Sequence, residues 1–200
     1  MGEVDNRRLV EAISPHVPIT ESQAEALTAH FGLVKRWNRV INLTRVVEWK
    51  DAVTRHYGEA AILARAIGLG SPSIVDIGSG AGFPGIPLAI LLPGSSITLV
   101  EVDQRKGAFL KEASRGIANC NVAVRRSADV GGSFDWLVSR AVKWEDVEEA
   151  AARLAKDVAV LGGVDFPEST SVQWLDRRDM PWGSKRALLI GRVVSRGTQD

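Results

Sequence analysis

Three glycines at alternate positions, Gly78, Gly80 and Gly82, directly follow a short apolar run at residues 73–77. Without Cβ atoms, glycines let a chain turn sharply at the end of a strand and let a ligand approach the backbone closely. A plain tight turn is the alternative interpretation. The feature predicts a buried strand that runs into a loop of the nucleotide-binding kind.

After this loop, short apolar runs alternate with segments of helical composition. Those segments are rich in Ala, Leu, Lys and Glu, for example residues 106–118 and 144–156. Because the runs are apolar on both faces, the alternation predicts an α/β fold with a mostly parallel sheet covered on two sides. The last run is expected to be antiparallel. The predicted strands after the loop are residues 96–102, 121–124, 134–138, 157–161 and 186–194.

The first third of the chain has a helical pattern instead. Thr20 and Gln23 have the spacing of a capping box, and apolar residues follow at helical intervals. A second helix is expected over residues 49–67. We therefore expect an N-terminal helical extension, residues 1–70, followed by a nucleotide-binding domain, residues 71–200.

Composition narrows the class of protein further. A chain of 200 residues with 45% hydrophobic and 24% charged residues is typical of a folded globular protein. Its one cysteine, Cys120, excludes an internal disulfide and a Cys-x-x-Cys metal site. The N-terminus lacks a secretory apolar region, and no apolar stretch reaches the roughly 18 residues that span a bilayer. We expect a cytoplasmic protein without a metal.

Two cofactor classes compete for the glycine loop. Residues 80–85 match the G-x-G-x-x-G pattern of nicotinamide-binding proteins. However, Pro84 and Pro87 suit a loop and a first helical turn, not the established helix of that pattern. Asp76 stands two residues before Gly78, and the resulting D-x-G-x-G-x-G form resembles motif I of S-adenosylmethionine-dependent methyltransferases.

An acidic residue at the end of the second strand supports a nucleoside ligand. Glu101 lies 23 positions after Gly78, close to the spacing of about 20 for a carboxylate that binds ribose hydroxyls. Asp103 is a competitor for this role, but it is better placed to cap the following helix. Glu101 is therefore the predicted ribose ligand.

The string from Val75 to Ile90 extends well beyond a general methyltransferase motif. It closely resembles the glucose-inhibited division protein B family, the guanine-N7 methyltransferases of bacterial 16S ribosomal RNA. The resemblance covers roughly residues 30–162. Its further matches, in the order of the family, are residues 37–44, 55–56, 99–101, 106, 109–110, 121–122 and 134–141.

This resemblance implies a Rossmann-like class I methyltransferase fold with a seven-stranded sheet, and S-adenosylmethionine as cofactor. It also assigns cofactor contacts to residues after the third and fourth strands. Asp129 replaces the family's usual Glu there and is one methylene shorter. The predicted cofactor-binding residues are Asp76, Gly78, Ser79, Gly80, Phe83, Glu101, Ala128, Asp129 and Arg140.

Methylation of guanine N7 requires no general base, because N7 carries a lone pair and no proton. The site would instead align the reactants and supply donors to guanine O6 and N7. Asn42, His56, Arg140 and Arg186 are the predicted catalytic residues, with Arg45 as a further candidate. Asn42 could instead bond to backbone at the end of its helix, and His56 could be a satisfied interior histidine.

Basic residues cluster locally although the net charge is only +1. Such clusters could neutralise RNA phosphates, or they could be solvated helix faces. We expect 16S ribosomal RNA or the 30S particle as the partner of a monomeric protein. The clustered residues are Lys35, Arg36, Arg39, Arg45, Lys50, Arg55, Arg125, Arg126, Arg177, Arg178, Lys185, Arg186, Arg192 and Arg196.

The chain departs from the family pattern at three places. Gly162 stands where the family usually has Lys, and residues 163–180 form a shorter segment than is usual in the family. Residues 57–59 follow His56 where the family usually has Phe-x-Asp-Ser. Two other functions stay open at this point. One is a methyltransferase for a small molecule or a protein, with the N-terminal helices as a lid. The other is a non-catalytic relative that binds S-adenosylmethionine or RNA.

Overall fold

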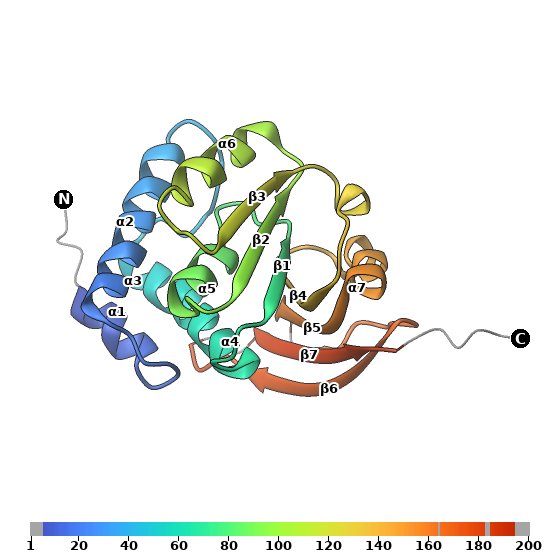
Figure 1. Ribbon diagram of the computed structural model, residues 1–200. Helices are drawn as coiled ribbons and strands as arrows, with labels where there is room; N and C mark the ends of the chain where they lie inside the picture. The colour runs from blue at the N-terminus through green and yellow to red at the C-terminus, as the bar shows by residue number, and fades with distance from the viewer. Residues whose placement is uncertain (1–5, 164, 183–184, 195–200) are drawn as a thin grey trace, which may run out of the picture.

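A sheet of seven strands forms the centre of the computed structural model, which describes residues 6–163, 165–182 and 185–194 (Figure 1). The strands are β1 (Ser73–Ile77), β2 (Ser96–Glu101), β3 (Cys120–Val124), β4 (Phe134–Arg140), β5 (Ala155–Gly162), β6 (Val172–Asp179) and β7 (Ala187–Val193). Their order across the sheet is β3-β2-β1-β4-β5-β7-β6. Strands β1 to β5 pair in parallel, whereas β7 runs antiparallel to both β5 and β6. The predicted mostly parallel seven-stranded sheet with an antiparallel last strand is confirmed.

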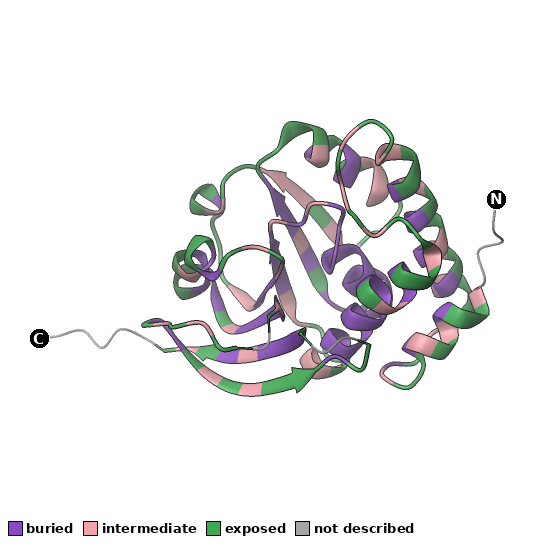
Figure 2. Ribbon diagram, turned by 180° about the vertical axis from the view of Figure 1, so that it is seen from behind, coloured by how far each residue is buried: buried purple, intermediate pink, exposed green. Residues whose placement is uncertain are grey.

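Strand β6 is the one element of this sheet that the sequence pattern did not predict. Charged residues occupy half of it, and most of its side chains are at least partly exposed because it forms an edge of the sheet (Figure 2). It is held by an antiparallel ladder in which Gln173 lies opposite Arg192. Because the strand lies at an edge of the sheet and half of its residues are charged, no apolar run marks it in the sequence.

Helices cover both faces of the sheet. They are α1 (Asn6–Ile13), α2 (Glu21–Trp37), α3 (Trp49–Ala52), a π-helix (Val53–Gly58), α4 (Glu59–Ile67), α5 (Gly85–Leu91), α6 (Gln104–Ala113), α7 (Glu148–Leu154), and the 3-10 helices Ser127–Asp129 and Trp144–Asp146. Helical structure runs without a break over residues 49–67, as predicted. The predicted helices at residues 106–118 and 144–156 were too long, because α6 ends at Ala113 and β5 begins at Ala155.

Local capping signals are confirmed at two helices. Thr20 and Gln23 form a reciprocal capping box at the start of α2. Asp103 caps α6 by accepting hydrogen bonds from the backbone N–H groups of Arg105 and Lys106, at 2.8 and 3.0 Å. The carboxylate of Asp103 is therefore committed to the helix, which leaves Glu101 as the strand-end acid that can face a ligand.

The core lies on both sides of the sheet because successive strand residues point to opposite faces. Ile74 of β1 belongs to a cluster that includes Leu27 and Phe31 of α2, whereas Val75 packs on the side of α7 with Leu154. The helices before residue 71 thus share one continuous core with the sheet. Among the described residues, no helix is long and apolar enough to cross a membrane.

The strand order places the loop after β1 at the centre of the carboxyl edge. From β1 the sheet continues through β2 and β3 in one direction and through β4 and β5 in the other. In open α/β sheets, ligands bind outside the carboxyl ends of the strands at this change of direction. The glycine loop that the sequence singled out lies at that position (Figure 1).

Candidate active site

The loop after β1 is folded tightly against the end of β2. The backbone N–H groups of Gly78 and Ser79 both donate to the carbonyl of Val100, at 3.0 and 3.1 Å. Gly78, Gly80 and Gly82 all have positive φ angles, of 75°, 53° and 81°. Residues other than glycine rarely adopt these φ angles, so the backbone path of the loop requires the three glycines.

Asp76 lies beneath this loop. Its carboxylate is fully buried, and Oδ2 accepts a hydrogen bond of 3.0 Å from the backbone N–H of Gly85 at the start of α5. Its Oδ1 has no hydrogen-bond partner among the described residues. Burial raises the pKa of Asp76 to about 7. The structure thus places Asp76 as an anchor between the strand and α5, behind the surface that a ligand could reach.

Glu101 ends β2 with its carboxylate fixed by three backbone donors. Oε2 accepts from Gly80 N at 3.0 Å, and Oε1 accepts from Val102 N and Asp103 N, each at 2.9 Å. An ionised carboxylate has about four acceptor positions, so one remains for a ligand hydroxyl. Val102 beside it is an apolar side chain with 62% of its surface exposed.

A small cavity opens between the glycine loop, the end of β4 and the segment before α3. Its volume is about 150 Å³, and it is lined by Leu43, Thr44, His56, Gly78, Ser79, Gly80, Ala81, Phe83, Arg140 and Ala141. Four of the predicted loop residues, together with His56 and Arg140, therefore surround one space. Asn42 is exposed and precedes the two lining residues of its own segment.

The aromatic wall of the cavity consists of His56 stacked on Phe83. Their ring centroids lie 4.1 Å apart with 20° between the planes. Both nitrogens of His56 are bonded within the protein, Nε2 to Thr44 Oγ1 and Nδ1 to the Arg55 carbonyl, each at 3.2 Å. Burial, followed by the charge of Arg140, lowers the pKa of His56 to about 2. His56 is therefore a satisfied interior histidine, as the alternative interpretation holds, and it still lines the cavity.

A second buried histidine, which sequence reasoning missed, supports the loop from behind. His30 lies within hydrogen-bond distance of the Ala81 carbonyl, 3.1 Å from Nε2, and of the Tyr57 hydroxyl, 3.2 Å from Nδ1. Since a carbonyl can only accept, Nε2 carries the proton and Nδ1 accepts from Tyr57. The sequence contains one signal for this role, because His30 is a polar residue between Leu27 and Phe31 on the apolar face of α2.

Glu59 joins two of the predicted arginines, although no pattern had singled it out for this role. Arg186 donates to it from Nε and Nη2 at 2.6 and 2.7 Å, and Arg140 Nε donates at 3.2 Å. Arg140 Nη2 also donates to the Arg55 carbonyl at 2.9 Å. Glu59 is only 2% exposed. Two guanidinium groups share one carboxylate, so a net positive charge remains beside the cavity.

The predicted residues after β3 lie on the same edge of the sheet but outside the cavity. Ala128 and Asp129 are exposed in a short 3-10 helix. Arg153 of α7 holds this helix by donating to the carbonyls of Val130 and Ser127, at 2.6 and 2.7 Å. Arg153 therefore fixes the segment in which the predicted adenine-reading residues lie.

Asn38, and not Asn42, is the asparagine that bonds to backbone groups at the end of α2. Asn38 Oδ1 accepts from the backbone N–H groups of Leu43 and Thr44 at 2.8 and 3.0 Å, and its amide donates to the Thr44 carbonyl at 3.0 Å. The turn after α2 is consequently closed by Asn38. Asn42 has no part in these three bonds.

Comparison with known proteins settles the family. The family model described as rRNA small subunit methyltransferase G matches residues 23–161. The chain belongs to this family. This confirms the resemblance read from residues 75–90.

Named members of the family are similar over most of the matched region. The chain is 36% identical to ribosomal RNA small subunit methyltransferase G of Solibacter usitatus over 129 residues, which cover 64% of this chain and 59% of the relative. It is 35% identical to the Francisella philomiragia protein of the same name over 162 residues, which cover 78% of each chain. Against the first relatives the chain therefore spans only about three fifths of their length.

Solved structures support the fold independently of sequence. The magnesium protoporphyrin IX methyltransferase of Synechocystis, crystallised with SAH, superimposes with a TM-score of 0.60 at 14% identity, covering 83% of this chain and 94% of that one. A SAM-dependent methyltransferase of Aquifex aeolicus gives a TM-score of 0.57 at 12% identity, covering 72% and 93%. The class I methyltransferase fold is confirmed.

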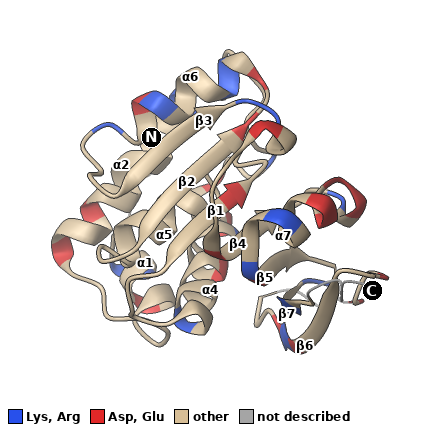
Figure 3. Ribbon diagram, turned by 45° about the vertical axis from the view of Figure 1, so that its right-hand side comes forward, with Lys and Arg blue, Asp and Glu red and all other residues tan. Residues whose placement is uncertain are grey.

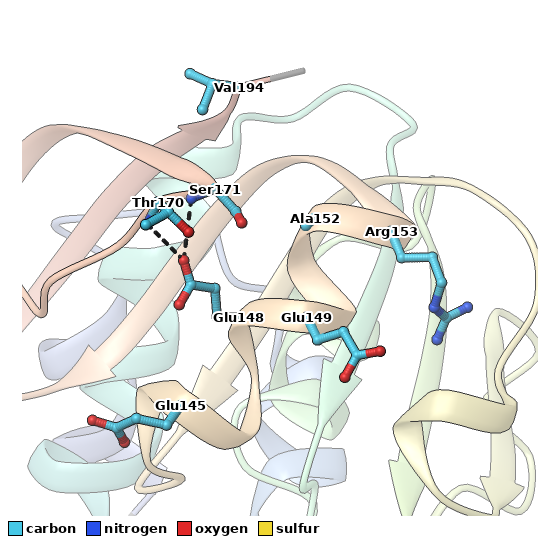
Figure 4. A pocket seen from close by; sticks show the side chains of 8 residues that line it. All are labelled: Glu145, Glu148, Glu149, Ala152, Arg153, Thr170, Ser171 and Val194. Carbon is cyan, nitrogen blue, oxygen red and sulfur yellow. Dashed lines mark hydrogen bonds between the residues drawn. The ribbon is translucent and has the colours of Figure 1, made fainter. Parts of the chain in front are cut away.

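A larger hollow lies away from the glycine loop, between α7 and the start of β6 (Figure 4). Its volume is about 500 Å³. Glu145, Glu148 and Glu149 line it, and Glu148 accepts hydrogen bonds from Ser169 Oγ and from the backbone of Thr170. An acidic lining repels phosphates and carboxylates, so the smaller cavity at the glycine loop fits a ligand that carries such a group better.

Ion pairs neutralise much of the predicted basic cluster near the C-terminus. Basic and acidic segments lie side by side along β6 and β7 (Figure 3). Three arginines there each have an acidic partner, and Arg196 lies outside the described residues. The pairs are Arg177–Asp179, Arg178–Asp176 and Arg192–Asp157. The predicted basic residues at 39–55 and 125–126 form no such pairs within the described part of the chain, so these two segments keep their positive charge.

Proposed function

We propose that the chain transfers the methyl group of S-adenosylmethionine to guanine N7 of bacterial 16S ribosomal RNA. The observation that carries the proposal is the cavity at the glycine loop, which Arg140 lines. Glu101 is bonded to Gly80 of that loop and retains one acceptor position, and Glu59 joins Arg140 to Arg186. The names of the relatives support a ribosomal RNA substrate. The resemblance to guanine-N7 methyltransferases supports the target atom.

The residues around the loop fit a nucleoside cofactor with an amino acid tail. Glu101 would accept from the ribose hydroxyls, and the exposed apolar surface of Val102 and Ala128 suits an adenine ring. Asp129 would accept from the adenine amino group, and Arg140 would pair with the carboxylate. The cavity of about 150 Å³ is smaller than the roughly 300–1,000 Å³ of whole ligand sites. It therefore suits the reacting end, with the remainder of the nucleoside outside it.

The chain's own residues have two tasks in such a reaction. S-adenosylmethionine supplies an electrophilic methyl group, and N7 needs no proton removed, so alignment and local charge are what the protein adds. His56 and Phe83 form an apolar wall that keeps water from one side of the cavity. Arg140 and Arg186 supply positive charge that suits guanine O6 and N7 or a neighbouring phosphate.

We further infer that the protein acts as a monomer in the cytoplasm, where its RNA substrate is made. The described residues include no group of three or more His, Cys, Asp or Glu side chains that could hold a metal. The unpaired cations at residues 39–55 and 125–126 favour RNA over a small molecule as the methyl acceptor. They would give binding a strong dependence on salt.

The test uses 30S particles and naked 16S RNA from a strain that lacks the corresponding methyltransferase. Purified protein and labelled S-adenosylmethionine should yield one N7-methylguanine, mapped by borohydride reduction and aniline cleavage. Glu101→Ala should weaken cofactor binding at least ten-fold, since it removes a buried acceptor. Asp51→Ala, an exposed carboxylate, serves as its control. Cofactor binding without methyl transfer to either RNA substrate would overturn the proposal.

A further inference from the structure

A groove separate from the cavity lies between the turn after α2 and the N-terminal part of α6. Its volume is about 530 Å³, and it is lined by Trp37, Val40, Ile41, Gln104, Arg105 and Ala108. Four of these six side chains are apolar. Val40 is 79% exposed, and it forms one apolar surface with Trp37, Ile41 and Ala108; contiguous apolar surface of this kind marks interaction sites.

The floor of the groove is held rigidly. Trp37 Nε1 donates to Glu112 Oε2 at 2.9 Å, and the indole packs edge-on against Phe109 with 5.9 Å between ring centroids. Arg36 also pairs with Glu112, at 3.4 Å, so that carboxylate is already neutralised. A half-buried indole that cannot rotate away offers a preformed apolar surface at little entropic cost.

The rim of the groove is positive. Arg105 lines the groove, and Arg39 precedes Val40 in the chain. Both are exposed, and neither forms an ion pair with any residue in the described ranges. Lys106 follows Arg105 on α6. The nearest acid in sequence is Asp103, whose carboxylate accepts from two backbone N–H groups of the helix. Apolar floor and cationic rim together match what an unpaired nucleotide presents, a flat base and a phosphate.

One turn of the chain contributes lining residues to both the groove and the cavity. Val40 and Ile41 line the groove, whereas Leu43 and Thr44 line the cavity. Asn38 closes this turn with three hydrogen bonds, so its two ends keep a constant spacing. An RNA strand that presents one base to the cavity would therefore cross the turn and meet the groove within a few nucleotides.

We propose that this groove binds an unpaired nucleotide of the RNA substrate that flanks the target guanine. The base packs on Trp37, Val40 and Ile41, and its phosphate pairs with Arg105 and Arg39. The inference rests on the proposed function and adds a second contact to it. It assigns to the turn after α2 the task of selecting RNA in which a nucleotide within about three positions of the target is unstacked.

The experiment compares two groove variants with two controls in full-length protein. Val40→Ser removes apolar surface and Arg105→Gln removes a charge. The matched controls are Leu69→Ser, an apolar residue that is 70% exposed on the loop before β1, and Arg115→Gln, an exposed residue just after the other end of α6. All four residues are at the surface, so thermal unfolding should stay at the wild-type temperature.

Both groove variants should raise the KM for 30S particles by about five- to ten-fold, with kcat at saturating RNA and the Kd for S-adenosylmethionine unchanged. Arg105→Gln should also lower the slope of log K against log salt by about 0.7–1. The controls should match the wild type. If Val40→Ser has the same KM for 30S particles as Leu69→Ser, the groove does not bind RNA. That result overturns the inference but leaves the proposed methyltransferase function in place.

A photocrosslinker at position 40 identifies the occupant directly. Crosslinking to a 16S nucleotide within about three positions of the modified guanine supports the inference. Crosslinking only to a ribosomal protein would overturn it. If the wild type binds no ribosomal RNA and methylates none, the proposed function itself fails and the groove assignment fails with it.

Discussion

Replacing Glu59 with Gln removes the negative charge that Arg140 and Arg186 share. Loss of one partner from a buried ion pair costs about 3–5 kcal/mol, because the other charge stays buried without compensation. Here the two arginine side chains are 15% and 24% exposed, so water can restore part of their solvation, and Gln keeps an acceptor oxygen. We therefore expect the free energy of unfolding to fall by about 2–3 kcal/mol. For a chain of this size, that lowers Tm by about 5–10 °C.

Urea titration measures this loss as a lower midpoint at an unchanged slope. Glu11→Gln is the control, because Glu11 pairs with Arg7 at the surface with 64% of its side chain exposed. Surface pairs contribute at most about 1 kcal/mol. Glu59→Asp keeps the charge, so it should recover much of the stability. If Glu59→Gln is no less stable than Glu11→Gln, the carboxylate does not hold the two arginines together.

Three further predictions concern the loop, the buried histidine and a helix cap. Gly85→Ala should lower the free energy of unfolding by about 1–3 kcal/mol, since a Cβ there would lie 2.6 Å from Asp76 Oδ2. Gly32→Ala, in open space within α2, should raise it by about 0.5–1 kcal/mol, and equal effects in urea titrations would contradict the packing. The pKa of His56 is lowered from 6.5 to about 2, so below pH 6.5 the unfolded state binds a proton first. The stability of the wild type relative to His56→Gln should then decrease as pH falls from 6.5 to 4, by up to about 1.4 kcal/mol per pH unit; a difference independent of pH would refute this. Asp103→Ala should cost about 1 kcal/mol and Asp103→Asn almost nothing, and equal unfolding midpoints for the two would rule out the cap.

Features that depend on near neighbours in the chain were predictable. The glycine loop, the capping box at Thr20 and the cap at Asp103 each need only a few consecutive residues. The parallel strands were predictable for the same reason, since an apolar run bounded by turns is a local pattern. The helix predicted over residues 106–118 ends early, before a turn at Gly116, whose φ is 88°. At the end of the helix predicted over residues 144–156, tertiary pairing outweighed helix propensity. Ala155, for example, pairs with Phe134 of β4 and so begins a strand.

Features that depend on distant residues were not predictable. Glu59 meets Arg140 across 81 positions and Arg186 across 127, and no spacing rule relates residues so far apart. His30 reaches the loop at Ala81 in the same way, across 51 positions. Such contacts exist only after the sheet has brought the carboxyl ends of its strands together.

The sequence by itself determined the loop after β1, the acid at the end of β2 and the family, because glycine geometry and strand patterning are local. Only the tertiary structure decided how the predicted residues divide their work. It buried Asp76 as an anchor, bonded both nitrogens of His56 within the protein, and joined Arg140 to Arg186 through Glu59. The physical reason is that burial and charge pairing are set by what packs against a side chain, and those neighbours come from other elements.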